Sequence, residues 1–283
     1  MSFKRFFTAT AAAAVLALSA GTANAASFPD FVVDPTMSGA TSGGLTFTAD
    51  KITGNYVEFI EFTSPNTFNY AIRWVAGQFV KDDGTTALNA GDTGLGLPGN
   101  FGGYGLYAEA IGSGTFTTVA GVTTFVTNAG GSIQFTYDLY GAANVNRTDY
   151  TNAAGSINSQ AALFAKTGNG TDIDLLAAGA AIDGLGKLDP STCSSGGINC
   201  GSFGQQSGIL LNASGRNFFT SPVPFYTLAF NSGQLNNFEV GRTQTINGSL
   251  DLVFNTTPEP SGLALVGLAL FGVGMARRRS LKK

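Results

Sequence analysis

The sequence predicts an all-β protein, an antiparallel β-sandwich with a jelly roll as one arrangement of it and only minor helix. Three observations lead to this class. Short segments rich in threonine and aromatic residues recur along the chain, separated by glycine-rich turns. The composition includes 39 glycines and 23 phenylalanines, and its 43% hydrophobic share is not that of a disordered chain. No repeat of about 20 to 50 residues is visible, which argues against a solenoid or a propeller.

The first 25 residues have the pattern of a secretory signal peptide. Lys4 and Arg5 form a basic head, an apolar run follows over residues 8–20, and small residues surround Asn24 just before Ala26. A leader of this kind is removed on export and takes no part in the fold. We expect cleavage between Ala25 and Ala26, followed by one β-rich exported domain over residues 26–255, long enough for one sizeable core.

Strands are expected throughout the N-terminal half. In residues 68–74 the four large side chains at even positions fall on one face, and Trp74 continues that series into the core. Residues 133–139 alternate between apolar and polar in the same way. The run from Lys81 to Gly84 predicts a turn, because Asp tolerates and Gly favours positive φ. Further strands are expected at 28–33, 45–49, 55–62, 114–119 and 122–127, the last two joined in a hairpin through Ala120-Gly121.

The C-terminal half is less regular. Residues 141–155 predict a polar excursion, and the Ala and Leu content of 159–166 and 173–179 predicts short helices or turns. Strands are expected again at 209–212, 224–230, 238–242, 244–247 and 250–254. The folded domain therefore closes on a strand just before the C-terminal segment.

Charge excludes one class of function. Between residues 26 and 257 there are 8 basic and 17 acidic side chains, a formal charge of −9. The other 7 of the 15 basic residues lie in the two end segments. An acidic exported domain repels the phosphate backbone of nucleic acids. We therefore expect no nucleic-acid partner.

The chain has no histidine, which excludes Ser-His-Asp and Cys-His catalysis and nearly every zinc or copper site. Carboxylate pairs are the remaining enzymatic option, since glycosidases need two across a sugar cleft. Glu58 and Glu61 fall on opposite faces of a strand, and Glu109 and Glu239 are isolated, so surface charge is the simpler interpretation. The glycine motif at 94–99 has neither the strand before it nor the helix after it that a nucleotide site requires. No catalytic residue is predicted.

Cys193 and Cys200 are the only cysteines. An even number in an exported chain predicts a disulfide, worth roughly 2.5 kcal/mol for so short a loop if it acts through chain entropy. A metal or redox pair is the weaker interpretation, because no histidine is present to join the two thiols.

Two binding sites are weaker expectations. Asp172 and Asp174 follow glycines in a pattern similar to calcium-binding Gly/Asp repeats, although only one copy is present. No other metal and no cofactor is expected. Trp74, Tyr104 and Tyr107 would form a sugar-stacking platform if they were exposed, but Trp74 fits the core better.

The last 28 residues contain three parts in order: Pro258-Glu259-Pro260, an apolar helix expected over residues 261–276, and a basic end that includes Arg277, Arg278 and Arg279. The uncharged run reaches roughly 22 Å as a helix, short of a hydrocarbon core about 30 Å thick. Its basic end favours the cytoplasmic side. An ordinary single-pass membrane anchor is one interpretation of these three parts.

A second interpretation is a sorting signal, because this order of parts resembles the PEP-CTERM sorting tail of Gram-negative bacteria. The resemblance implies transient anchoring in the inner membrane and processing by an exosortase, in bacteria that make exopolysaccharide. It also implies a final location at the cell surface or in the extracellular matrix.

The body is similar to the flocculation-associated group of PEP-CTERM proteins, and the resemblance rests on residues 47–56, 102–107, 197–204 and 244–249. No catalytic motif comes with that group. The implied role is a non-enzymatic surface or matrix protein that promotes flocculation or biofilm formation together with exopolysaccharide. The alternatives are a lectin-like carbohydrate-binding module and a carboxylate-dependent polysaccharide hydrolase or lyase.

Overall fold

A computed structural model describes residues 28–38, 46–140, 149–167, 173–192, 201–235 and 239–255. Within these ranges the strands are β1 (Phe31–Val33), β2 (Phe47–Ala49), β3 (Lys51–Ser64), β4 (Thr67–Lys81), β5 (Thr86–Ala87), β6 (Tyr104–Val119), β7 (Val122–Thr127), β8 (Gly130–Leu139), β9 (Asp149–Tyr150), β10 (Lys166–Thr167), β11 (Ile173–Leu188), β12 (Gly201–Leu211), β13 (Phe219–Ser221), β14 (Leu228–Leu235) and β15 (Gln244–Asn255). The α-helices are α2 (Ala90–Thr93), α3 (Gln160–Leu163) and α4 (Ala213–Phe218). Single 3₁₀ turns are η1 (Pro35–Ser38), η2 (Gly99–Phe101), η4 (Ala154–Ser156) and η5 (Pro190–Thr192).

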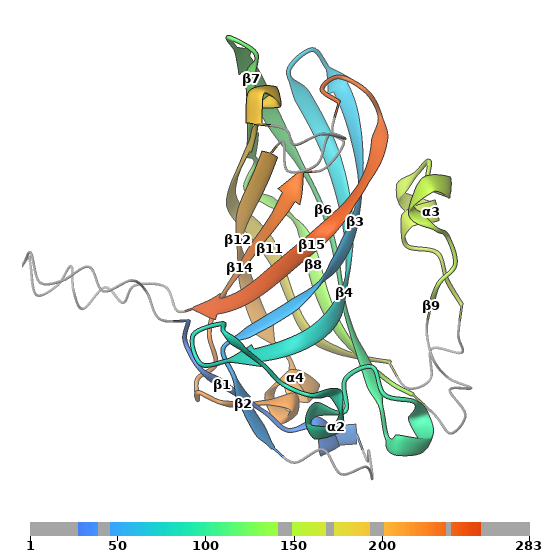
Figure 1. Ribbon diagram of the computed structural model, residues 1–283, viewed down its shortest axis with the longest axis vertical. Coiled ribbons are helices and arrows are strands. Elements are labelled where there is room, and N and C mark those ends of the chain that lie inside the picture. The colour runs from blue at the N-terminus through green and yellow to red at the C-terminus, as the bar shows by residue number, and fades with distance from the viewer. Residues whose placement is uncertain are drawn as a thin grey trace, which may run out of the picture.

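The large sheet is antiparallel and closes on itself. Its order is β5-β4-β3-β15-β14-β12-β11-β7-β6-β8, and the additional pairings β4–β6 and β11–β8 join its two sides. The ring runs β4-β3-β15-β14-β12-β11-β8-β6 and back to β4, with β7 replacing β8 between β6 and β11 towards one end (Figure 1). Closure gives the long strands a partner on each side, which removes exposed hydrogen-bonding edges. The predicted all-β antiparallel class is confirmed.

Opposite walls of the closed sheet face each other across one core, as the two layers of a sandwich do. One end is covered by α4 and by the small sheet β13-β1-β2 (Figure 1). Phe31, Phe219 and Phe254 meet there, with ring centroids 5.2 to 5.8 Å apart. Each fully buried ring of this size contributes about 1.5–3 kcal/mol of transfer free energy, so this aromatic cluster holds the small sheet against the large one.

A short arm over residues 149–167, which includes β9, α3 and β10, packs on the outer wall (Figure 1). Leu163 is fully buried and contacts a small cluster that includes Ala71 of β4. The Arg73 guanidinium donates hydrogen bonds to the carbonyl oxygens of Leu163 (2.9 Å) and Asn152 (2.7 Å), and its Cζ lies 4.7 Å from the centroid of the Tyr150 ring. One buried cation therefore satisfies backbone groups of the arm and attaches it to the sheet.

Several predicted elements are confirmed in detail. The strand expected at 68–74 lies within β4 and the one at 133–139 within β8. The hairpin between β6 and β7 turns through Ala120 (φ 51°) and Gly121 (φ 83°), as a two-residue hairpin with two positive φ values requires. Asp82, Asp83 and Gly84 all have positive φ at the predicted turn.

Three predictions about the C-terminal half were wrong. Residues 173–179, expected as helix or turn, begin the 16-residue strand β11. Pairing outweighs helix propensity in this segment, because residues 173–179 pair with β8 and residues 177–179 also pair with β12. Residues 239–242 form no strand, and the two strands expected at 244–247 and 250–254 are one, β15. At 159–166 the expected short helix is α3.

None of the helices in the described ranges has the length and hydrophobicity needed to cross a membrane. The predicted signal peptide, the cysteine loop and the sorting tail with its expected helix at 261–276 lie outside those ranges.

Candidate functional site

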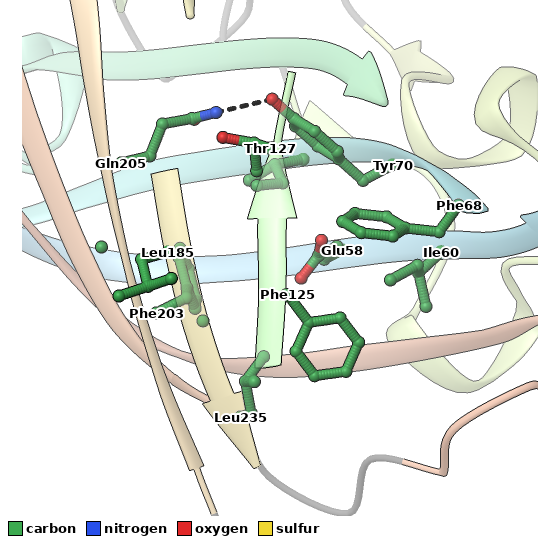
Figure 2. A pocket seen from close by; sticks show the side chains of 13 residues that line it. Glu58, Ile60, Phe68, Tyr70, Phe125, Thr127, Leu185, Phe203, Gln205 and Leu235 are labelled. Carbon is green, nitrogen blue, oxygen red and sulfur yellow. Dashed lines mark hydrogen bonds between the residues drawn. The ribbon is translucent and has the colours of Figure 1, made fainter. Parts of the chain in front are cut away.

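The interior of the closed sheet contains a cavity with unusual polar groups. Inward positions alternate along β3 and β4, so Glu58 lies on the same face as Ile60, and Tyr70 on the same face as Phe68. These four side chains line the cavity with Phe125 and Thr127 of β7, Leu185 and Gly186 of β11, Phe203, Gly204 and Gln205 of β12, Ile72 and Leu235 (Figure 2). The volume open to the centre of a water molecule is about 50 Å³.

Glu58 is the acidic residue of this cavity. Its side chain points into the space between the walls (Figure 2), and the residue is 7% exposed. Among the described residues it has neither a hydrogen-bond nor an ion-pair partner. Burial raises the pKa of Glu58 to about 8, because the low-dielectric interior disfavours the carboxylate. At neutral pH the group is therefore mostly a neutral carboxylic acid that can donate a hydrogen bond.

Three further polar groups, those of Tyr70, Gln205 and Thr127, face the same space. The Gln205 side-chain amide donates a hydrogen bond to the Tyr70 hydroxyl oxygen at 2.6 Å (Figure 2). That oxygen is an acceptor in this bond, so the phenol keeps its own hydrogen to donate. Burial raises the pKa of Tyr70, which keeps the phenol neutral. The Thr127 Oγ1 atom is buried and makes no hydrogen bond within the described ranges.

A second interior cavity of about the same size adjoins the first, and the two share Ile72, Phe203 and Gln205. It extends towards the covered end and is lined mainly by apolar side chains, including Phe135, Phe219 and Phe254. Trp74 also lines it, and is the only tryptophan of the chain. The interior thus forms a continuous apolar lining with polar groups gathered near Glu58.

The outer wall has a separate, larger groove across β11, β12, β14 and β15. The volume open to the centre of a water molecule is about 490 Å³, and the groove is lined by Leu185, Gly186, Lys187, Ser202, Phe203, Gly204, Ser232, Gly233, Gln234, Ser249 and Asp251. Asp251 pairs with Lys51 at 3.2 Å. Phe230 is 49% exposed and lies beside Gly204 of the groove, because a methyl group on Gly204 would be 3.8 Å from the Phe230 ring. Polar side chains and one exposed aromatic ring therefore lie on the same surface.

The predicted aromatic platform does not form on the surface. Trp74, Tyr104 and Tyr107 are all buried, and the core position preferred for Trp74 is confirmed. Tyr104 stacks on Tyr137 with centroids 4.9 Å apart, and the Tyr107 and Tyr140 hydroxyl oxygens are 3.1 Å apart. Tyr104 also packs against Phe218 of α4 at the covered end, whereas Tyr107 packs against Tyr150 of the arm, so neither ring presents a face to a sugar.

The other predicted site residues lie largely outside the described ranges. They are Ala25, Ala26, Asp172, Cys193, Cys200, Pro258, Glu259, Pro260, Arg277, Arg278 and Arg279. Asp174 lies in β11, opposite Tyr137 of β8. The calcium site and the disulfide stay predictions.

The four glutamates of the described chain differ in their surroundings. Glu61 is exposed on the outer face, Glu109 pairs with Lys166 at 2.6 Å, and Glu239 pairs with Arg242 at 2.8 Å. The expectation of surface charge was wrong for Glu58 alone. A signal was present, because Glu58 lies two residues after Tyr56 and two before Ile60, on the buried face of one strand. Gln205 was missed because residues 201–208 were not predicted as strand.

The fold and these two sites define a class: an all-β domain with a closed antiparallel sheet, an apolar interior and a polar outer groove. Comparison with protein families indicates where the protein is sent in the cell. The family model for the PEP-CTERM protein-sorting motif matches residues 256–279. The chain therefore carries this motif and is an exported, cell-surface-directed protein that is sorted by an exosortase. The match covers the tail alone and leaves the flocculation-associated group untested. No curated protein and no solved structure matches the chain.

Proposed function

We propose that this protein is a non-enzymatic component of the cell surface or extracellular matrix, which promotes flocculation or biofilm formation by associating with exopolysaccharide. Its outer groove is the observation that carries the proposal. Ser202, Ser232 and Gln234 offer hydroxyl and amide groups that match the donors and acceptors of sugar hydroxyls. The exposed Phe230 ring beside them provides an apolar face for a sugar ring to cover.

The groove also favours binding over hydrolysis. Glycoside hydrolysis uses two carboxyl groups, about 5 to 9.5 Å apart, on either side of the scissile bond. Among the residues that line the groove, Asp251 has the single carboxylate, and it is paired with Lys51. An open groove on the face of a sheet suits a long polymer better than a closed pocket for one sugar, which favours a matrix component over a lectin with a defined sugar pocket.

The sorting tail supports the location. We propose that the C-terminal helix holds the protein briefly in the inner membrane before an exosortase releases it, so that the domain reaches the polysaccharide outside the cell. Intact mass and location of the mature protein test this step. We expect loss of the leader and processing near Pro258-Glu259-Pro260, whereas full-length protein in the cytosol would contradict export.

Deletion of the gene tests the function. We expect aggregates to disperse while polysaccharide secretion continues, and undiminished aggregation would reject the proposal. A saturable signal for one oligosaccharide on a glycan array would favour the lectin alternative. Release of reducing ends from the host polymer, abolished by substitution of one glutamate, would favour the hydrolase.

A further inference from the structure

We propose that the interior cavity around Glu58 is a binding site for a small neutral molecule with an apolar body and one carbonyl oxygen. The site differs from the outer groove in its polar groups, because Glu58, Tyr70 and Thr127 line the cavity and not the groove, although both are bordered by Leu185, Gly186, Phe203 and Gly204. The polar groups of the cavity indicate a ligand. An unpaired carboxylic acid, a phenol with a free hydrogen and an unbonded threonine hydroxyl all lie in one apolar cavity.

Such groups are costly to bury without partners. A buried polar group that lacks a hydrogen bond costs about 1–3 kcal/mol, which is why nearly all buried groups have one. The Oγ1 atom of Thr127 is fully buried and has none within the described chain. Glu58, which is 7% exposed, has no hydrogen-bond partner there either. A ligand that accepts hydrogen bonds here would recover that cost.

The protonation state selects the ligand. At neutral pH Glu58 is an acid, and the Tyr70 hydroxyl already accepts a bond from Gln205, so both groups have a hydrogen to donate. A carbonyl oxygen can accept both bonds. Binding of an anion is disfavoured, because the anion would lose its hydration on entering a cavity lined by isoleucine and phenylalanine, which costs free energy.

The size of the ligand follows from the cavity. A volume of 50 Å³ open to the centre of a water molecule corresponds to about four waters, and the adjoining cavity provides about as much again. A molecule of roughly five to ten heavy atoms fits this space. Phe68, Phe125 and Ile60 would contact its apolar body.

Cyclohexanone and methylenecyclohexane form a matched pair of probes, because they have the same shape and differ in the oxygen. Trp74 lines the adjoining cavity and has the chain's single indole N–H, which gives one resolved signal in a ¹⁵N–¹H spectrum of the mature protein. We expect both probes to shift this signal saturably at pH 6.5, with cyclohexanone binding roughly 25-fold more tightly, as two hydrogen bonds of about 1 kcal/mol each provide.

Two variants assign the effect to Glu58. Glu58→Leu keeps the volume and removes one of the two donors, so the preference for cyclohexanone should fall to roughly fivefold, which the Tyr70 hydrogen bond still provides. Glu58→Gln keeps an N–H donor and should retain the preference. Glu61→Gln, on the exposed face of the same strand, should behave as the wild type. The unliganded indole signal of each variant checks that it is folded.

Acidity provides a second readout. In the wild type the preference should fall at least to that of Glu58→Leu as the pH rises above about 8, when Glu58 loses its proton, and it should persist in Glu58→Gln. Tyr56 and Tyr70 are the titratable groups that interact electrostatically with Glu58, and the pKa of each is raised by burial, so neither ionises in this window. The proposal is overturned if cyclohexanone leaves the indole signal unmoved, if the oxygen makes no difference in the wild type, or if Glu58→Leu keeps the full preference of the wild type.

Discussion

The indole N–H of Trp74 donates a hydrogen bond to the carbonyl oxygen of Leu250 over 3.0 Å, although β3 lies between their strands. The contact exists because Gly54 of β3 pairs with Leu250 and has no side chain to block the ring. A Cβ atom at Gly54 would lie 2.4 Å from the indole nitrogen and 2.4 Å from the Val75 carbonyl oxygen. Three neighbouring strands of the closed sheet are thus linked through one ring.

Gly54→Ala should therefore destabilise the protein. Neither the ring nor the backbone can move aside freely, so we expect the free energy of unfolding to fall by about 1–3 kcal/mol. Gly77→Ala is the matched control, since its new Cβ would have no heavy atom nearer than 3.6 Å. Urea denaturation of both variants measures the difference, and equal losses would show that the ring does not need the space at Gly54.

The pH dependence of stability should reveal Glu58. Its pKa is about 8 in the folded protein and near 4.5 in the unfolded chain, so the folded state holds one more proton between these values. Stability from this group is complete below about pH 4.5, falls as the pH rises to about 8, and changes no further above that.

Glu58→Gln should remove this slope and stabilise the protein at pH 7 by on the order of 1–3 kcal/mol. Melting temperatures of the variant and the wild type, taken from pH 5 to 9, measure the effect. Parallel curves for the two proteins would mean that Glu58 is ionised in the fold. Glu61→Gln is the control, because its side chain is exposed on the outer face.

Arg73→Met should loosen the arm over residues 149–167. The substitution removes the donors to Leu163 and Asn152, and hydrogen bonds from charged groups contribute about 1.5–3 kcal/mol. Amide hydrogen exchange in the arm should quicken roughly tenfold or more, while exchange in the closed sheet changes little. Arg242→Met is the control, since the Arg242–Glu239 pair is exposed and worth about 0–1 kcal/mol. Unchanged exchange in the arm would show that its apolar contacts suffice.

Phe230→Ala should weaken association with the polysaccharide of the producing bacterium. Loss of one stacking ring is expected to reduce affinity roughly three- to tenfold, which cosedimentation of the purified protein with the polymer would measure. Leu210→Ala is the control, because Leu210 is an exposed apolar residue of β12 six positions beyond Gly204, whereas the Phe230 ring lies beside Gly204 of the groove. If both variants bind as the wild type does, the polymer contacts another face.

Cys193 and Cys200 should be unreactive towards a thiol reagent in the purified protein and become reactive after reduction. Mass spectrometry before and after reduction measures this. Removal of the disulfide by Cys→Ser at both positions is expected to lower the free energy of unfolding by roughly 2.5 kcal/mol. Free thiols in the native protein would contradict the prediction.

Local patterns predicted much of this fold correctly because they depend on neighbouring residues alone. Alternation placed Trp74 and the even positions before it in the core, and turn chemistry located the hairpin at Ala120-Gly121. The same alternation contained the signal for Glu58, since a strand turns every second side chain to one face. That signal was passed over because a carboxylate is usually a surface group.

By itself, the sequence determined the antiparallel β class and the inward faces of its clearest strands. Through the sorting motif at residues 256–279 it also determined that the protein is exported. Only the tertiary structure decided that the sheet closes, that the Ala- and Gly-rich segment after Ile173 is a strand, and that Glu58 meets Tyr70, Gln205 and Thr127 in one cavity. These features depend on pairings between residues far apart in the chain. Their energies come from close packing and shared burial, which no short stretch of sequence contains.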